Sequence, residues 1–462
     1  MHASASRATP KAAQARAQAQ KRHALLVVLL LLVAVLGLGG GAWRIATEGA
    51  GVLGISNAVP WGWDVVGFVF WIGLGHAGTL ISAVLLLTHQ SWRRPIARHA
   101  ELMTLCAVLT AAVFPLVHVG RILMLWQMSP LPVASGVWPN PSSALVWDAA
   151  AISSYFLLSL LYWLLGMLRG RRDSAALRSC RSRTCLLMAA VLTPLVVTVH
   201  SVVGCDFALT LRWNSPLLPP YFVCGALLSG MAAVQLIALF RSCGAEVRSH
   251  LAHLTLGLAW SMGLFYALEL LREPGLMSLR YGWMLALNVG LPCLYARSDW
   301  RKSRPVAALV SVGILVGMWL EREHIIIDRS VAVAGGTYQP TETDVAMLLG
   351  SIGLFLALFL GISRSISHRV PVESEDEPQE APCSAPCPAP DRPGQWALAG
   401  AGMGGAVSAA WLLLTRTADT AGVLTGRPHG LPFDLPLLLV ASLLGAGLAL
   451  FLHFLYRLHT ES

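Results

Sequence analysis

The sequence predicts an all-α polytopic membrane protein with about twelve transmembrane helices. Of its 462 residues, 55% are hydrophobic and only 12% are charged, against roughly 25% charged in a typical soluble domain. Apolar runs of about 20 residues recur along the chain, and each is long enough to cross a hydrocarbon core of about 30 Å. Lys and Arg gather in alternate loops, as the positive-inside rule requires. These observations exclude an ordinary soluble enzyme.

Twelve apolar segments supply the predicted spans, and the regions between them set the domain boundaries. Residues 1–23 form a predicted cytoplasmic tail, 24–369 a core of ten spans, 370–394 a linker, and 395–462 a C-terminal hairpin of two spans. The predicted spans are 24–42, 62–88, 102–126, 144–168, 185–204, 218–240, 251–271, 280–297, 304–321, 344–363, 396–414 and 433–456.

The first span begins with KRHALLVVLLLLVAVLG, which has the charged front of a signal peptide. Its apolar core is long and no small-x-small cleavage site follows it, so we expect an uncleaved anchor with a cytoplasmic N-terminus. The net charge of +9 raises the question of nucleic acid, but with this orientation 24 of the 33 basic residues fall in inside segments. The charge therefore indicates topology in a bacterial inner membrane, with lipid as the contact and no nucleic acid.

The linker, VPVESEDEPQEAPCSAPCPAPDRPG, is acidic and rich in proline. Such a composition cannot bury a core, so it predicts a flexible cytoplasmic segment between the ten-span core and the terminal pair.

Ionisable residues inside the spans are the candidates for function, because each costs at least about 2.5 to 3.5 kcal/mol in hydrocarbon. The predicted topology places most of them at one level near the outer face, with His76 near the bilayer centre. The candidates are Asp64, His76, His118, Arg121, Asp148, His200, Asp206, Glu269, Glu321 and Arg322.

His118, Asp148 and Arg121 form a set that suits the oxidation of a quinol. A histidine accepts a proton near neutral pH, a carboxylate accepts or relays the other, and an arginine stabilises a developing anion. His118 and Arg121 are predicted to lie one turn apart on one helix. His200, Asp206 and Arg322 are predicted to shape the quinol site around this set.

Several of the candidates have other interpretations. Asp64 and Asp148 lie in the first turns of their spans, where a carboxylate also stabilises the helix dipole and caps free amides. Asp206 could be an ordinary loop charge, and Glu269 could simply pair with Arg272. His76, alone at mid-depth, is open to three roles: a packing residue, a member of a proton path, or a haem ligand.

Several motifs together resemble those of the NrfD/PsrC-like membrane subunits, in particular the ActC subunits of bacterial alternative complex III. The resemblance covers about residues 24–370, and the order of the motifs makes it specific. The motifs are WGWDVVGFVFWIGLGHAGTLISAVLLL, FPLVHVGR, WPNPSSALVWDAAAISSYFLLSLLYW, HSVVGCDFAL, PPYFVCGALLSG and GMWLEREHIII.

This resemblance implies a ten-helix core with two four-helix bundles that binds neither metal nor haem and oxidises quinol, menaquinol or ubiquinol, near the outer face. Electrons would pass to an iron-sulfur protein subunit and then to c-type cytochrome subunits, with a terminal oxidase downstream. A second NrfD-like membrane subunit is implied as a further partner. The hairpin sequence GRPHGLPFDLPLLLVASLLGAGLAL resembles a shortened small two-helix subunit of the same complex, which implies a fusion; the alternative is an anchor hairpin.

The family's quinol histidine falls on His118 in FPLVHVGR and its partner aspartate on Asp148 in LVWD. Its outer-segment aspartate falls on Asp206, although the flanking GCDF departs from the family pattern, and its MWxER arginine falls on Arg322. Asp64 and His76 match positions of the family's proposed proton path.

Four alternatives stay open at this point. The chain could reduce quinone with electrons from a periplasmic molybdenum or multihaem partner. It could be a b-type cytochrome with His76, His118 and His200 as axial ligands, although such haems need histidine pairs at matching depth. It could be a secondary transporter, for which internal repeats and broken helices are expected. Proton translocation through Asp64, His76, Glu269 and Glu321 is a further hypothesis.

Overall fold

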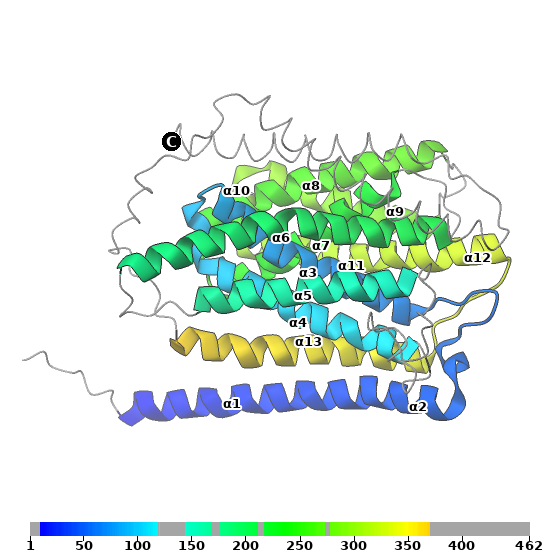
Figure 1. Cartoon of the computed structure of the whole chain (residues 1–462), viewed down its shortest axis with the longest axis horizontal. Coiled ribbons are helices and arrows are strands. Elements are labelled where there is room, and N and C mark those ends of the chain that lie inside the picture. Colours follow the sequence, from blue (N-terminus) through cyan, green and yellow to red (C-terminus); the bar gives the residue numbers. More distant parts are fainter. Residues whose placement is uncertain are drawn as a thin grey trace, which may run out of the picture.

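The computed structural model describes residues 10–118, 120, 144–167, 175–210, 217–272 and 278–369, and these fold into helices with no strand among them (Figure 1). Eight helices within this part of the chain are long and apolar enough to cross a membrane. The prediction of an all-α, multi-pass membrane protein is therefore confirmed. The predicted linker and hairpin, 370–394 and 395–462, lie outside the described residues.

The chain begins with a long helical segment, α1 (Pro10–Ala34), η1 (Val35–Gly39) and α2 (Gly40–Glu48), followed by the short η2 (Ala50–Leu53). The remaining elements are α3 (Trp63–Leu87), η3 (Ser91–Arg93), α4 (Arg94–His118), α5 (Ala144–Met167), α6 (Ala175–Thr210), α7 (Leu218–Phe240), α8 (Ala245–Arg272), α9 (Leu279–Leu285), η6 (Ala286–Gly290), η7 (Leu291–Ala296), α10 (Ser298–Lys302), α11 (Arg304–Glu323), η8 (His324–Asp328), α12 (Arg329–Ala334) and α13 (Glu342–Arg369).

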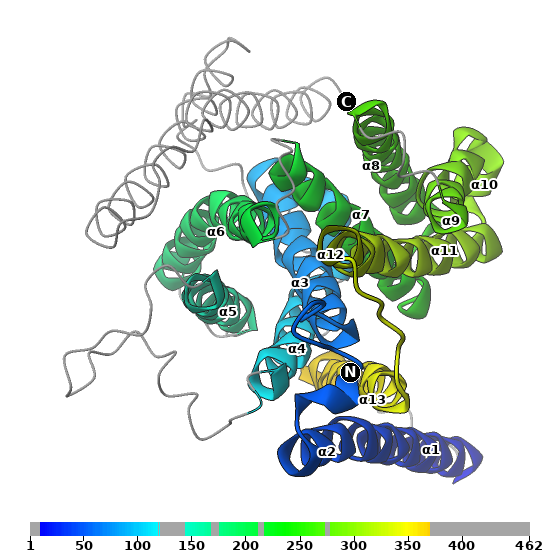
Figure 2. The same ribbon diagram turned by 90° about the vertical axis from the view of Figure 1, so that its right-hand side faces the viewer.

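Two sets of helices each close into a ring of contacts. In the first helix group, α3 contacts α4 and α6, and α5 contacts α4 and α6. In the second helix group, α7 contacts α8 and α11, and η6 contacts α8, α9 and α11. The two groups meet through α3, α6, α7 and α11, while α1 and α13 pair at the edge (Figure 2).

Helix α3 is the central element of the molecule. Of the residues in its most apolar stretch, 83% are buried, against 22% for the first helix. Small residues allow this enclosure: a Cβ added at Gly78 would lie 2.6 Å from Oγ1 of Thr104 on α4, and one at Gly67 would lie 2.8 Å from the ring of Phe114. Close packing of backbones is how membrane helices associate without a hydrophobic driving force.

Three predicted span limits are wrong in ways that affect the site. Helix α4 ends at His118, not at 126, and Gly120 has a φ of 67°, in the left-handed region that does not continue an α-helix. Helix α6 continues through His200 to Thr210. The helical run that begins at Arg304 continues to Ala334, through the buried Glu-Arg-Glu-His stretch and the apolar residues that follow it.

Candidate functional site

The closest contact between predicted site residues joins His118 and Asp64. Nδ1 of His118, the last residue of α4, lies 2.6 Å from Oδ2 of Asp64 in the first turn of α3. The Asp64 side chain is fully buried, whereas 26% of the His118 side chain is exposed. A buried carboxylate that holds one ring nitrogen leaves the other nitrogen, on the exposed side of the pair, for a ligand.

Asp64 does not act as a helix cap. The N-cap residue of α3 is Gly62, and no side chain accepts a hydrogen bond there. One Asp64 oxygen contacts His118, and the other, Oδ1, is buried without a hydrogen-bond partner among the described residues. An unsatisfied buried carboxylate oxygen is costly, so its position fits a group that is kept for function.

The loop before α13 anchors this end of α3. The Tyr338 hydroxyl accepts a hydrogen bond from the backbone N–H of Trp63 (3.0 Å) and donates one to Oδ2 of Asp344 (3.1 Å). Burial, reinforced by the charge of Asp344, raises the pKa of Tyr338 above its usual range, so the hydroxyl remains protonated and able to donate. Thr341 and Asp344 cap α13 by reciprocal side-chain to backbone hydrogen bonds.

The other two members of the predicted His118 set are not placed. Arg121 lies outside the described residues, and the described part of Asp148 is its backbone in α5. Helix α4 ends at His118 and Gly120 has a φ of 67°; the predicted position of Arg121 one turn from His118 stays a prediction.

The sequence suggested that His76 is alone at mid-depth, but in the structure it has a partner. Its Nδ1 lies 2.6 Å from Nδ1 of His200 on α6, the two rings are nearly perpendicular, and both side chains are buried. His200 lies at this depth because α6 runs ten residues beyond it. The pair is about 18 Å along α3 from Asp64 at 1.5 Å per residue. His76 is therefore at mid-depth as predicted, whereas His200 lies beside it and not at the outer level that the sequence predicted.

The geometry of the histidine pair decides what it can hold. One imidazole Nδ1 donates to the other, and neither Nε2 has a hydrogen-bond partner among the described residues. Two axial ligands of one iron lie on opposite sides of it, about 4 Å apart at roughly 2 Å per metal–nitrogen bond. A separation of 2.6 Å leaves no space for a metal between the two Nδ1 atoms.

The second helix group contains a separate buried cluster around Glu321. The Tyr266 hydroxyl donates to Oε2 of Glu321 and accepts from the Asn288 amide (2.8 Å). The Arg322 guanidinium lies 3.3 Å from Glu321 and 4.5 Å above the Phe222 ring. Arg322 is predicted at a helix end, but the structure buries it in a continuing helix, where ion pairing and a cation–π contact stabilise its charge.

The remaining predicted residues lie on the helices around these clusters. Glu269 is buried on α8, three residues after Tyr266, and Asp206 is half-buried within α6 rather than in an outer loop. The structure therefore separates the candidates into a His118–Asp64 pair, a His76–His200 pair and the Glu321 cluster.

Several buried polar residues were not named in the sequence analysis, and Glu101 is one of them. Glu101 is buried on α4, accepts a hydrogen bond from the Ser82 hydroxyl (2.6 Å) and pairs with Arg98 (2.8 Å). The predicted span began at residue 102, one residue too late to include it. A carboxylate three residues after an arginine, next to an apolar run, was the available signal.

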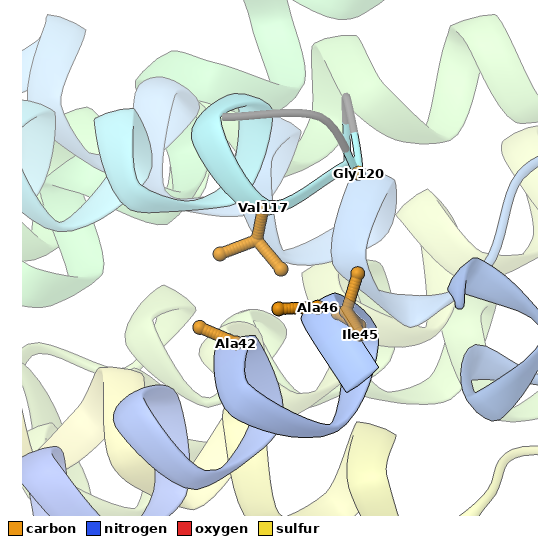
Figure 3. A pocket seen from close by; sticks show the side chains of 5 residues that line it. All are labelled: Ala42, Ile45, Ala46, Val117 and Gly120. Atoms are coloured by element: carbon orange, nitrogen blue, oxygen red, sulfur yellow. The ribbon is translucent and has the colours of Figure 1, made fainter. Parts of the chain in front are cut away.

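The described residues beside His118 leave little empty space. Val117 and Gly120 line a cavity of about 10 Å³ with three residues of α2, Ala42, Ile45 and Ala46 (Figure 3). This is room for about one water molecule, so these residues alone do not accommodate a quinol ring. Two members of the predicted site, Arg121 and the Asp148 side chain, lie outside the described residues.

The comparisons with known proteins agree on one family of membrane subunits. The family model described as "Polysulphide reductase, NrfD" matches residues 51–372. A putative dimethyl sulfoxide reductase membrane subunit of Halobacterium salinarum is 27% identical over 379 residues, which cover 69% of this chain and 85% of that protein. The "Hdr-like menaquinol oxidoreductase integral membrane subunit" of Archaeoglobus fulgidus is 25% identical over 228 residues, 47% of this chain and about half (53%) of that protein.

Proposed function

We propose, from the premise that this chain belongs to the NrfD family of membrane subunits, that it oxidises quinol beside the Asp64–His118 pair and delivers the electrons to an iron-sulfur partner subunit. The chain is a multi-pass membrane subunit of a quinone-linked oxidoreductase, as its similarity to such subunits indicates. The specific proposal is a complex of the alternative complex III type, in which this chain contributes the quinol site.

The observation that carries the proposal is the 2.6 Å contact between Nδ1 of His118 and Oδ2 of Asp64. Oxidation of a quinol releases two electrons and two protons. With Nδ1–H donated to Asp64, Nε2 of His118 is the ring nitrogen that can accept a proton from a quinol hydroxyl. The Asp64 carboxylate then stabilises the imidazolium, and the partly exposed ring can release the proton outward.

A second acceptor is needed for the other quinol hydroxyl, and we assign it to Asp148 on α5. Arg121 and Asp206 are proposed to shape the site and to stabilise negative charge on the quinol oxygens. His200 and Arg322 were predicted at this site, but they are held in the His76–His200 pair and in the Glu321 cluster. The name of the Archaeoglobus fulgidus relative favours menaquinol over ubiquinol as the substrate.

The proposed surroundings follow from the same assignment. We place the chain in a bacterial inner membrane with its N-terminus in the cytoplasm, and expect c-type cytochrome subunits and a second NrfD-like subunit as partners, with a terminal oxidase downstream. The hairpin at 395–462 is proposed to be a fused small subunit.

The test is quinol-to-cytochrome activity in the assembled complex. We expect His118→Ala and Asp148→Asn each to lower turnover by roughly 10²- to 10⁴-fold, the usual contribution of a positioned acid or base. His250→Ala, which removes a half-exposed imidazole stacked on Trp92, is the control and should leave turnover unchanged. Unaltered turnover in His118→Ala would remove this residue from the mechanism.

The main alternative has the opposite direction, with electrons from a molybdenum or multihaem partner reducing quinone. The NrfD family description and the Halobacterium salinarum relative both carry the name of a reductase, so the partner has to be identified directly. The subunits that co-purify with this chain decide between the two directions. An iron-sulfur protein with c-type cytochromes supports quinol oxidation, and a molybdenum subunit supports quinone reduction.

We further propose that the chain itself binds no haem. An optical spectrum of the purified subunit tests this, because a reduced b-type band would assign haem to it.

We also propose proton translocation through Asp64, His76, Glu269 and Glu321, because all four ionisable side chains are buried. Vesicle measurements that return only the scalar proton-to-electron ratio would eliminate translocation.

A further inference from the structure

Helices α1 and α13 lie side by side at the edge of the molecule and run in opposite directions (Figures 1 and 2). Their packing is tightest near Gly37, where an added Cβ would lie 2.7 Å from Cα of Gly350. A Cβ added at Gly353 would lie 2.8 Å from a carbonyl oxygen of α1. At Gly361 the nearest atom, Cγ1 of Val27, is 4.0 Å away. The two helices therefore separate toward the N-terminal end of α1.

A groove of about 450 Å³ lies where the two helices separate. Its polar lining consists of Gln20, His23 and Arg364, and its apolar lining includes Val27 and Val28, one to two turns further along α1. The groove thus has a polar end that can donate hydrogen bonds and an apolar part beside it. Its volume falls in the range of ordinary small-molecule sites.

Within residues 10–47 and 345–369, the two helical segments that flank this groove, the side-chain charge has one sign. Neither residues 10–47 nor residues 345–369 contain an acidic side chain, whereas α1 carries several basic residues before its apolar part: Lys11, Arg16, Lys21 and Arg22. A groove with Arg364 and His23 in its wall and no nearby carboxylate on either helix attracts an anion.

We propose that this groove binds one phospholipid with an anionic headgroup. The phosphate would contact Arg364 and His23, and an acyl chain would follow Val27 and Val28 into the bilayer. The outer face of α1 at this height is apolar and open, with Leu25 60% and Val28 60% exposed, so lipid surrounds the groove in the membrane. This lipid site is independent of quinol chemistry.

The experiment uses the full chain, delipidated and returned to nanodiscs or micelles that contain either phosphatidylglycerol or phosphatidylcholine. Native mass spectrometry measures how much protein retains one lipid at each lipid concentration. We expect phosphatidylglycerol to be retained more tightly than phosphatidylcholine, and Arg364→Gln to weaken its affinity about fivefold, which corresponds to ~1 kcal/mol for one basic residue near a membrane surface.

Two further variants separate the groove from general surface charge. Lys21→Gln removes a charge from the same turn of α1 without lining the groove, and should leave phosphatidylglycerol retention unchanged. Gly361→Leu keeps every charge and fills the groove, and should lower retention at least as much as Arg364→Gln. If Gly361→Leu does not fold, the contrast between the other two variants still decides.

Two results would overturn the proposal. Equal retention of phosphatidylglycerol in wild type, Arg364→Gln and Gly361→Leu would mean that no lipid occupies the groove, leaving a protein segment or a second copy of the chain as its occupant. Competition by inorganic phosphate at the lipid concentration would mean that the groove recognises a free anion instead of a lipid.

Discussion

In the first helix group, two buried pairs of ionisable side chains keep atoms that have no hydrogen-bond partner among the described residues: Oδ1 of Asp64 beside His118, and both Nε2 atoms of the His76–His200 pair. In the second helix group, Oε1 of Glu321 and Nη1 of Arg322 also lack a hydrogen bond, but they face each other as an ion pair at 3.3 Å, and Oε2 of Glu321 accepts from the Tyr266 hydroxyl. The first arrangement leaves atoms to bind a ligand or proton, whereas the second uses its charges on each other. Burial of charge alone therefore does not mark a reactive site.

This difference predicts that the Glu321 cluster matters most for stability. Arg322→Met would leave the buried Glu321 carboxylate without its cation, and breaking a buried pair in this way costs about 3 to 5 kcal/mol. The double variant Glu321→Met/Arg322→Met should recover most of that loss. The free energy of unfolding in mixed detergent measures the loss in Arg322→Met and its recovery in the double variant.

The control for this prediction is Arg297→Met, which removes an exposed cation 4.0 Å from the exposed Asp299 and should cost no more than about 1 kcal/mol. A double variant as unstable as Arg322→Met alone would show that the cluster stabilises the fold by packing rather than by charge compensation.

The Asp64–His118 pair should behave in the opposite way, with an effect on turnover. Asp64→Asn removes the carboxylate that orients the imidazole, and loss of such a supporting contact typically costs about 10- to 100-fold. Quinol oxidation by the assembled complex measures the effect, and thermal stability should change less than in Arg322→Met. Turnover that survives intact would assign Asp64 a purely structural role.

The His76–His200 pair lies between these extremes. His200→Leu removes the partner of Nδ1 of His76, so that neither ring nitrogen of His76 is paired, at a cost of about 1 to 3 kcal/mol. His200→Gln, which can still form a hydrogen bond, should cost less. If the pair also carries protons, His200→Leu lowers the proton-to-electron ratio in vesicles with little change in quinol oxidation; an unchanged ratio limits the pair to packing.

The smallest effect is expected at the anchor of α3. Tyr338→Phe removes the hydroxyl that links the Trp63 N–H to Asp344, and the loss should be about 1 kcal/mol because the N–H lies in the first turn of a helix and can be solvated. Thermal unfolding measures it, with Trp43→Phe on the exposed face of α2 as the control. A loss as large as that of Arg322→Met would place Tyr338 among the main determinants of the fold.

Much of the fold could be predicted because its signal is local. An apolar run such as 62–88 is recognisable by composition alone, and α3 begins and ends within a residue of the predicted limits. The ends of helices that contain charged residues could not be predicted. In the sequence, Arg322 and Asp206 resemble residues at the membrane interface, where a span would end. The helices continue through both residues, because other helices supply partners for them.

The candidate site was predictable as a set of residue types but not as a set of contacts. Asp64, His76, His118 and His200 were all identified by charge within apolar runs, because hydrocarbon penalises such groups wherever they lie. Their pairing was not predicted, since Asp64 was considered as a cap and His76 as a solitary residue. The rotation of α3 against α4 and α6 decides which side chains meet.

By itself, the sequence determined that this protein is a helical, multi-pass membrane protein and which side chains are costly enough to keep for function. Only the tertiary structure decided that Asp64 meets His118, that His76 meets His200, and that Glu321 is neutralised within its own group. The physical reason is that transfer free energy depends on one residue and its depth, whereas a contact depends on the register and rotation of two helices distant in the chain.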